Sequence, residues 1–180
     1  VTLGSLSIAG GSRFLDGLLD QVMVWNKVLT KDERARLFGE QKVLCLRNVN
    51  VQLCDNLVAH WKFNEAGAGD NAVDEQGNHD ATQLNSPGTA GAVLDCGRTF
   101  NGSNQSFSVT GSGGSTEFDV GNDNRPFTVT TWITLDTKTA PMIFFSKRSS
   151  AGGLPGFELF YTNGTDRFAL QTVSYTHLTL

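Results

Sequence analysis

Residues 57–64 read Leu-Val-Ala-His-Trp-Lys-Phe-Asn, and apolar side chains occupy every second position of this stretch. The odd-numbered positions hold Leu, Ala, Trp and Phe, whereas the even-numbered positions include His, Lys and Asn. Successive side chains of a β-strand point to opposite faces, so this period of two predicts a strand with one buried face. Residues 127–135 repeat the alternation, with Phe, Val, Thr, Ile and Leu on one face. The two stretches together predict sheets that bury one side.

Several shorter strands are predicted between turn residues, and the Asn163-Gly164 pair is a strong hairpin signal between two of them. These strands cover residues 3–8, 18–25, 98–101, 106–110, 142–146, 156–161 and 167–172. One short helix is expected near residues 31–38, where Thr30 and Glu33 form a capping box. Many short strands separated by turns predict an all-β fold with this one helix.

The composition agrees with an all-β globular domain and argues against a disordered chain, a nucleic-acid-binding protein and a membrane-inserted protein. Of the 180 residues, 39% are hydrophobic and 20 are Gly, as in a globular protein rather than a disordered chain. Charged residues make up only 18%, and Gly, Ser, Thr and Asn take their place. The net charge is -4 and no run of Lys and Arg occurs, so nucleic acid is not an expected partner. No apolar stretch approaches 18 residues, so no membrane insertion is expected.

Two groups of motifs follow one another along the chain. The first group consists of residues 14–26, which read Phe-Leu-Asp-Gly-Leu-Leu-Asp-Gln-Val-Met-Val-Trp-Asn. Leu29, Thr30, Glu33 and residues 37–38 follow it in the sequence. The second comprises residues 57–65, 74–81, 100–102 and 127–133. These groups resemble the end and the beginning, respectively, of laminin-G-like jelly-roll domains, which have the concanavalin A-like lectin and glucanase architecture. The resemblance implies an antiparallel jelly-roll sandwich.

The same resemblance implies an order of pieces along the chain. Residues 1–42 correspond to the C-terminal part of one laminin-G-like repeat, and residues 57–173 correspond to the N-terminal part of a second repeat. Residues 43–56 are expected to form a linker. Residues 174–180 depart from the pattern and resemble a translated adaptor sequence, so we interpret them as a non-native tail.

The two pieces are expected to complement each other. Each piece alone would leave an open sheet edge and an uncovered apolar face, both of which are unfavourable in water. Residues 1–42 are the kind of piece that residues 57–173 lack. We therefore predict one circularly permuted jelly roll, in which the strand at 18–25 pairs with strands beyond residue 57 and Asp20 approaches the loop at 74–80.

Catalysis is not expected from this sequence. Glycosidases of the same architecture need two carboxylates that flank the scissile bond. Glu117 and Asp119 resemble the start of the acidic strand motif of retaining glucanases, but Gly121 occupies the position of the third acid. The sequence has neither a Gly-x-Ser-x-Gly elbow nor zinc-ligand spacing. We predict that the chain is not an enzyme.

The loop at residues 74–80, Asp-Glu-Gln-Gly-Asn-His-Asp, is a candidate calcium site. It groups the oxygen donors of Asp74, Asn78 and Asp80 around a Gly that permits a tight turn, and Ca²⁺ takes six to eight oxygen ligands. The family resemblance adds Asp20 as a ligand from the last strand of the domain. The alternative is an Asx-type turn whose side chains are solvated.

The three cysteines leave two readings open. Cys45 and Cys54 flank a short segment of the linker, and a disulfide between them would imply an oxidising compartment. Cys96 then has no partner in the chain, and the alternative is three free thiols. Together with the family resemblance, the disulfide hypothesis predicts an extracellular or cell-surface location.

The expected function is therefore a non-catalytic binding or adhesion module of a larger secreted or cell-surface protein, which recognises glycans or proteins and holds structural calcium. The alternative is an accessory carbohydrate-binding module of a glycoside hydrolase or another carbohydrate-active enzyme. Trp25, Trp61 and Trp132 lie in strongly apolar strand patterns, so they are predicted to be core residues rather than sugar-stacking platforms.

Overall fold

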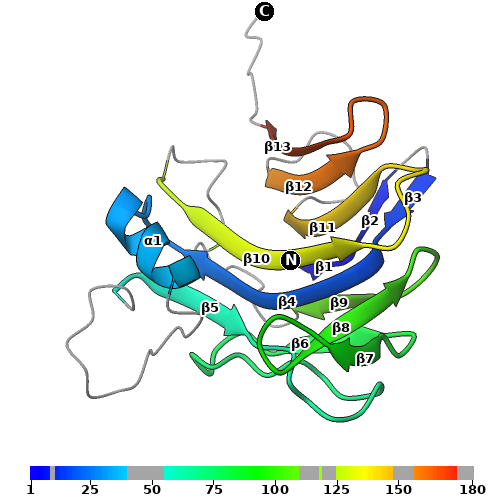
Figure 1. The fold of residues 1–180 in the computed structure, drawn as a ribbon, viewed down its shortest axis with the longest axis horizontal. Helices are drawn as coiled ribbons and strands as arrows, with labels where there is room; N and C mark the ends of the chain where they lie inside the picture. Colours follow the sequence, from blue (N-terminus) through cyan, green and yellow to red (C-terminus); the bar gives the residue numbers. More distant parts are fainter. Residues whose placement is uncertain (9–10, 40–54, 110–117, 119–124, 148–155, 174–180) are drawn as a thin grey trace, which may run out of the picture.

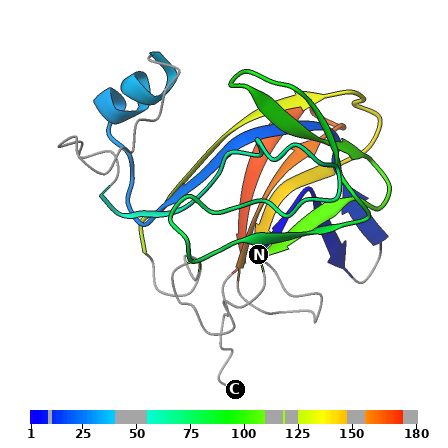
Figure 2. The same cartoon turned by 90° about the horizontal axis from the view of Figure 1, so that it is seen from below.

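The computed structural model describes residues 1–8, 11–39, 55–109, 118, 125–147 and 156–173. In this part of the chain, two antiparallel β-sheets face each other and enclose an apolar core (Figures 1 and 2). One helix lies at the end of the second sheet. The prediction of an all-β fold is confirmed for the described residues.

Among the described residues, the first sheet has six strands. Their spatial order is β13 (Arg167–Val173), β12 (Gly156–Thr162), β11 (Met142–Lys147), β1 (Thr2–Leu3), β9 (Ser106–Val109) and β6 (Ala81–Leu84). The hairpin predicted around Asn163-Gly164 is confirmed, because β12 and β13 pair from Thr162 and Arg167 onward. β13 and β6 are the two edges of this sheet.

The second sheet has five strands in the described part of the chain and is organised around one long strand. It contains β10 (Thr128–Leu135), β4 (Asp16–Trp25), β8 (Cys96–Asn101), β7 (Gly88–Gly91) and β5 (Leu57–Trp61). β4 pairs with β10 over almost its whole length, and with β8 and β5 in succession. The sequence-based strand at 18–25 therefore lies in the middle of this sheet.

This arrangement confirms the prediction that the strand at 18–25 pairs with strands beyond residue 57. β4 and β1 come from the first 39 residues, whereas all their partners in the two large sheets come from residues beyond 56. The first piece thus supplies an inner strand to each sheet (Figure 1). Neither large sheet is continuous without it.

The helix α1 (Lys31–Gly39) begins as the capping box predicts. The Glu33 N–H donates to Thr30 Oγ1 at 3.2 Å, and the Thr30 N–H donates to Glu33 Oε2 at 2.7 Å. The helix covers a small apolar cluster on the second sheet, formed by Met23, Trp25, Leu29, Leu37 and Leu57. Packing of this cluster compensates for the short length of the helix.

The main core surrounds Trp61, which is fully buried between the sheets. Its ring stacks on Phe118 at a centroid distance of 6.4 Å, and its indole N–H donates to the carbonyl of His79 at 2.7 Å. Trp25 is also fully buried, so the core prediction is confirmed for both residues. For Trp132 it is wrong: this side chain is half-buried and meets the exposed Phe38 of α1 edge-on, with centroids 5.5 Å apart.

The strand pattern differs from the expectation in two places. The strand predicted at 3–8 is divided at Gly4, whose φ of +79° places it in the left-handed region. β1 precedes this residue, and β2 (Ser5–Ile8) follows it and forms a separate hairpin with β3 (Gly11–Phe14). β6 and β7 are not predicted, because their sequences, Ala-Thr-Gln-Leu and Gly-Thr-Ala-Gly, contain only one β-branched residue each and no aromatic residue.

Candidate functional site

β4 changes its pairing partner at Asp20 and Gln21. Residues Asp16 to Leu19 pair with β8, and residues Val22 to Trp25 pair with β5. Gln21 lies between these two segments with a φ of 51°, an uncommon value for a residue that is not Gly. This irregularity places two polar side chains in the interior of an otherwise apolar strand.

Asp20 is fully buried at this point. Its Oδ2 accepts a hydrogen bond from the Leu94 N–H at 3.0 Å, and its Oδ1 has no hydrogen-bond partner among the described residues. Burial raises the pKa of Asp20 above its ordinary value, although the hydrogen bond from Leu94 acts in the opposite direction. The buried carboxylate is therefore only partly compensated in the described structure.

A polar chain leads from Gln21 towards the predicted calcium loop. Gln21 Oε1 lies 2.8 Å from Nε2 of the buried His60, and the backbone N–H of His60 donates to Asp74 Oδ1 at 2.8 Å. Burial, with a contribution from the positive charge of Lys62, lowers the pKa of His60 to about 4. His60 is therefore neutral at pH 7, and its ring serves as a hydrogen-bonding group within the sheet.

Asp74 is the centre of the loop at residues 74–80. Its side chain is 2% exposed and accepts hydrogen bonds from four described backbone N–H groups. The donors are His60 and Gln76 to Oδ1 and Asn78 and His79 to Oδ2, at 2.8 to 3.3 Å. A carboxylate has about four lone-pair positions, so the backbone alone occupies its usual capacity.

The other predicted calcium ligands are arranged around the same turn. Asp80 is exposed, and its Oδ1 accepts from the Asp74 N–H at 2.8 Å. Asn78 is exposed, and Gly77 between the two ends of the turn has a φ of 83°. These contacts have the form of the Asx-type turn that the sequence left as the alternative.

Asp20 is connected to the loop through β5, but the two do not form one ligand cluster in the described residues. Asp74 forms a bridge with Trp61 of β5, and Trp61 pairs with Val22 of β4, two residues from Asp20. However, no group of three or more His, Cys, Asp or Glu side chains in the described part of the chain could hold a metal ion. The calcium assignment to Asp20, Asp74, Asn78 and Asp80 therefore stays a prediction.

Other predicted residues lie where the structure gives no description. Cys45, Cys54, Glu117 and Asp119 are outside the described residues. Cys96 is described, and it is exposed and free. The disulfide and the acidic pair therefore stay predictions.

Sequence reasoning did not find the buried network around Arg98. This side chain is fully buried on β8, and its Nη2 lies 3.3 Å from Glu65 Oε2. Its Nη1 donates to the carbonyl of Gly67, and its guanidinium lies 5.7 Å from the centroid of the Phe107 ring. The network joins the loop at 65–70 to the core, and its partners are about 30 residues apart in the sequence, so no local motif indicates it.

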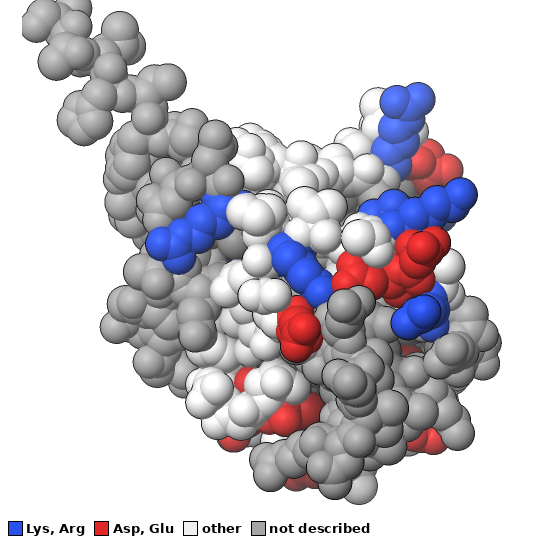
Figure 3. Space-filling view, turned by 90° about the vertical axis from the view of Figure 1, so that its left-hand side faces the viewer, with Lys and Arg blue, Asp and Glu red and all other residues white. Residues whose placement is uncertain are grey.

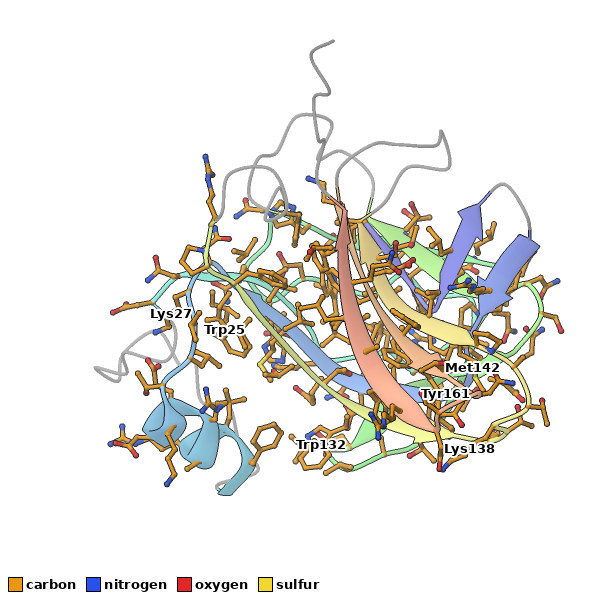
Figure 4. The ribbon with its side chains drawn as sticks, turned by 90° about the horizontal axis from the view of Figure 1, so that it is seen from above. Trp25, Lys27, Trp132, Lys138, Met142 and Tyr161 are labelled. Atoms are coloured by element: carbon orange, nitrogen blue, oxygen red, sulfur yellow. The ribbon has the colours of Figure 1, made fainter. Side chains whose placement is uncertain are left out.

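A groove of about 460 Å³ lies between the two sheets, where β10 and β13 form their edges. It is lined mainly by apolar side chains from β10, β11, β12 and β13, and α1 contributes Arg34 and Phe38 to its rim. Phe168 and Leu170 of β13 are 61% and 52% exposed there. In Figure 4, Trp132 lies on the helix side of β10, whereas Lys138 and Tyr161 lie near the start of β13. Pockets of a few hundred cubic ångström with apolar walls are the usual form of binding sites.

Comparisons with known proteins identify no relative. No family model, curated protein or solved structure matches this chain. Among the described residues, no helix is long and apolar enough to cross a membrane. The chemistry of the site is therefore the basis for a functional proposal.

Proposed function

We propose that the chain is a laminin-G-like antiparallel jelly-roll sandwich that acts as a non-catalytic binding or adhesion module. In this proposal it belongs to a larger secreted or cell-surface protein and recognises glycans or proteins. The resemblance of residues 14–26 and 57–65 to such domains supports the fold, and the two facing antiparallel sheets agree with it.

The observation that carries the binding function is the apolar groove between β10 and β13. Large side chains such as Phe168 and Leu170 are normally buried, so their exposure side by side in a concave surface is typical of an interaction site. The mixed charges on the face that carries α1 leave uncharged surface between them (Figure 3). A surface that combines charged and uncharged side chains is compatible with binding of either a protein or a glycan.

The two kinds of ligand would use different parts of the groove. A protein would cover the apolar side chains of β13, because burial of apolar area is the main favourable term in protein association. A sugar ring would stack on Phe38, which is 45% exposed and supported by Trp132. Substitutions at Leu170 and Phe38 therefore separate the two ligand classes.

The experiment is a binding measurement with the intact chain on a glycan array and on a panel of purified extracellular-matrix proteins. We expect saturable binding to at least one ligand, and mass spectrometry should find that ligand chemically unchanged. Leu170→Glu should weaken protein binding at least tenfold and Phe38→Ala should weaken glycan binding. Leu84→Glu, at an equally exposed position on β6, is the matched control. Absence of binding across both panels, or hydrolysis of a bound glycan, would refute the proposal.

A further inference from the structure

The groove is bordered by two open sheet edges. β10 is the last strand of the second sheet, and β13 is the last strand of the first sheet. Each therefore has one row of backbone N–H and C=O groups with no partner strand among the described residues. β10 has eight residues and β13 has seven, so each edge is roughly 25 Å long at about 3.4 Å per residue.

The side chains between these edges repeat with the period of a strand. Phe168 and Leu170 lie two residues apart, so they project from the same face of β13. Their pairing partners on β12, Tyr161 and Leu159, also contribute to the apolar core, and Leu159 lines the groove. From the opposite wall, Val129 and Ile133 of β10 line the groove and pack against the core. An occupant that matches these walls has apolar groups at alternate positions and a backbone that can form a ladder.

The charge of the groove restricts the occupant further. Among the described residues that line it, Arg34 is the one charged side chain, and no described carboxylate accompanies it. Its Nη1 donates to the carbonyl of Leu29, which fixes the guanidinium at the rim. A carboxylate on the occupant would complement this cation.

We propose that the groove between β10 and β13 binds an extended polypeptide segment that extends one of the two sheets. The segment has apolar side chains at alternate positions and an acidic residue near Arg34. This is recognition by β-strand addition, in which the backbone ladder provides affinity and the pockets for alternate side chains provide specificity. The inference rests on the proposed binding function and specifies its ligand as a protein strand.

The test uses the intact chain and a soluble nine-residue peptide in which Val and Thr alternate and Asp stands near one end. We expect saturable binding by calorimetry, together with slower amide hydrogen exchange in β10 or β13. A scrambled peptide of equal composition, and a peptide N-methylated at alternate amides, should each bind at least tenfold more weakly. Leu170→Glu should abolish binding, whereas Leu84→Glu on the opposite edge of the same sheet should leave it unchanged.

A second arm tests the predicted ion pair. Replacing the peptide Asp by Asn should weaken binding severalfold to the native chain but not to Arg34→Gln. If the Asn peptide binds the native chain equally well, the acidic preference is wrong.

Three outcomes would overturn the strand proposal. One is equal binding of the alternating and scrambled peptides, and another is protection of β6 in place of β10 and β13. The third is a concentration-dependent dimer, detected by light scattering, whose formation Leu170→Glu prevents, because a second copy would then occupy the groove. If glycans or whole proteins bind while the peptide does not, the strand proposal fails and the binding function stands; if nothing binds, both fail.

Discussion

Replacing Asp74 by Ala should cost much of the stability of the domain. Two of the four N–H groups that Asp74 accepts belong to His60 and His79, which are 2% and 5% exposed. Without the carboxylate, each of these buried N–H groups loses this acceptor, at a cost of about 1–3 kcal/mol. The other two donors, Gln76 and Asn78, are on exposed residues, where water replaces the lost acceptor.

The expected loss is therefore about 2–6 kcal/mol in the free energy of unfolding. A domain of this size has a total of roughly 5–15 kcal/mol, so the loss is a large part of the total stability. Asp74→Asn keeps one acceptor oxygen and should lose roughly half as much, because its amide nitrogen cannot accept from the N–H groups at the second oxygen position. The milder variant keeps the reasoning testable if Asp74→Ala does not fold.

Urea unfolding followed by the fluorescence of the buried Trp25 and Trp61 measures this loss, with chelator present. Asp70→Ala is the matched control, because the carboxylate of Asp70 accepts the Gly67 N–H at 2.8 Å in an exposed turn. It should cost less than about 1 kcal/mol. If Asp74→Ala costs no more than this control, the hydrogen-bond reasoning is wrong. If its cost appears only when calcium is added, Asp74 acts as a metal ligand.

Three further predictions concern the protonation of His60, the buried Arg98–Glu65 pair and calcium binding. Because the pKa of His60 is lowered to about 4, its protonation favours the unfolded chain, so stability should be constant above about pH 6.5 and should fall as the pH decreases towards 4. The free energy of unfolding should be about 2 kcal/mol lower at pH 5 than at pH 7.5, and His60→Gln should remove most of this difference. Arg98→Met leaves Glu65 without its buried cation and should cost about 3 kcal/mol or more in urea unfolding, whereas Lys138→Met, in an exposed pair with Asp166, should change little. The calcium hypothesis predicts that millimolar Ca²⁺ raises the melting temperature and that Asp20→Asn removes this rise; identical calorimetric curves with calcium and with chelator would eliminate the hypothesis.

Local patterns in the sequence predicted the elements whose determinants are local. The Thr30 and Glu33 capping box lies within four residues, and the structure contains both of its hydrogen bonds. The alternation at residues 57–64 predicted the strand β5, but its prediction of one buried face is wrong, because both faces of β5 are buried. The Asn163-Gly164 signal predicted the β12–β13 hairpin. Each of these signals is complete within a short window, so it predicted the element itself, whereas the burial of the second face of β5 depends on tertiary packing.

The candidate site could be predicted only in part, because its geometry depends on distant partners. Sequence reasoning identified Asp74 and its turn, but the donor from His60 reaches Asp74 from a different strand, 14 residues earlier. Asp20 was identified through the family resemblance, whereas its Leu94 partner is 74 residues away. The role of such a carboxylate depends on which donors surround it, and the local sequence does not contain that information.

The groove shows why an apolar pattern predicts a buried face without identifying what covers it. The alternation of Phe168 and Leu170 is the same in a central strand and in an edge strand, because each needs one apolar face. Their exposure follows from sheet order: β4 and β1 of the first piece occupy central positions, and β10 and β13 remain as edges on the same side of the core. The first piece thus fills the centre of both sheets, and the described strands leave one side of the sandwich open between β10 and β13. A strand bound at that opening would bury the apolar side chains and pair the free backbone groups together, whereas a globular surface or a sugar could satisfy only one of these two requirements.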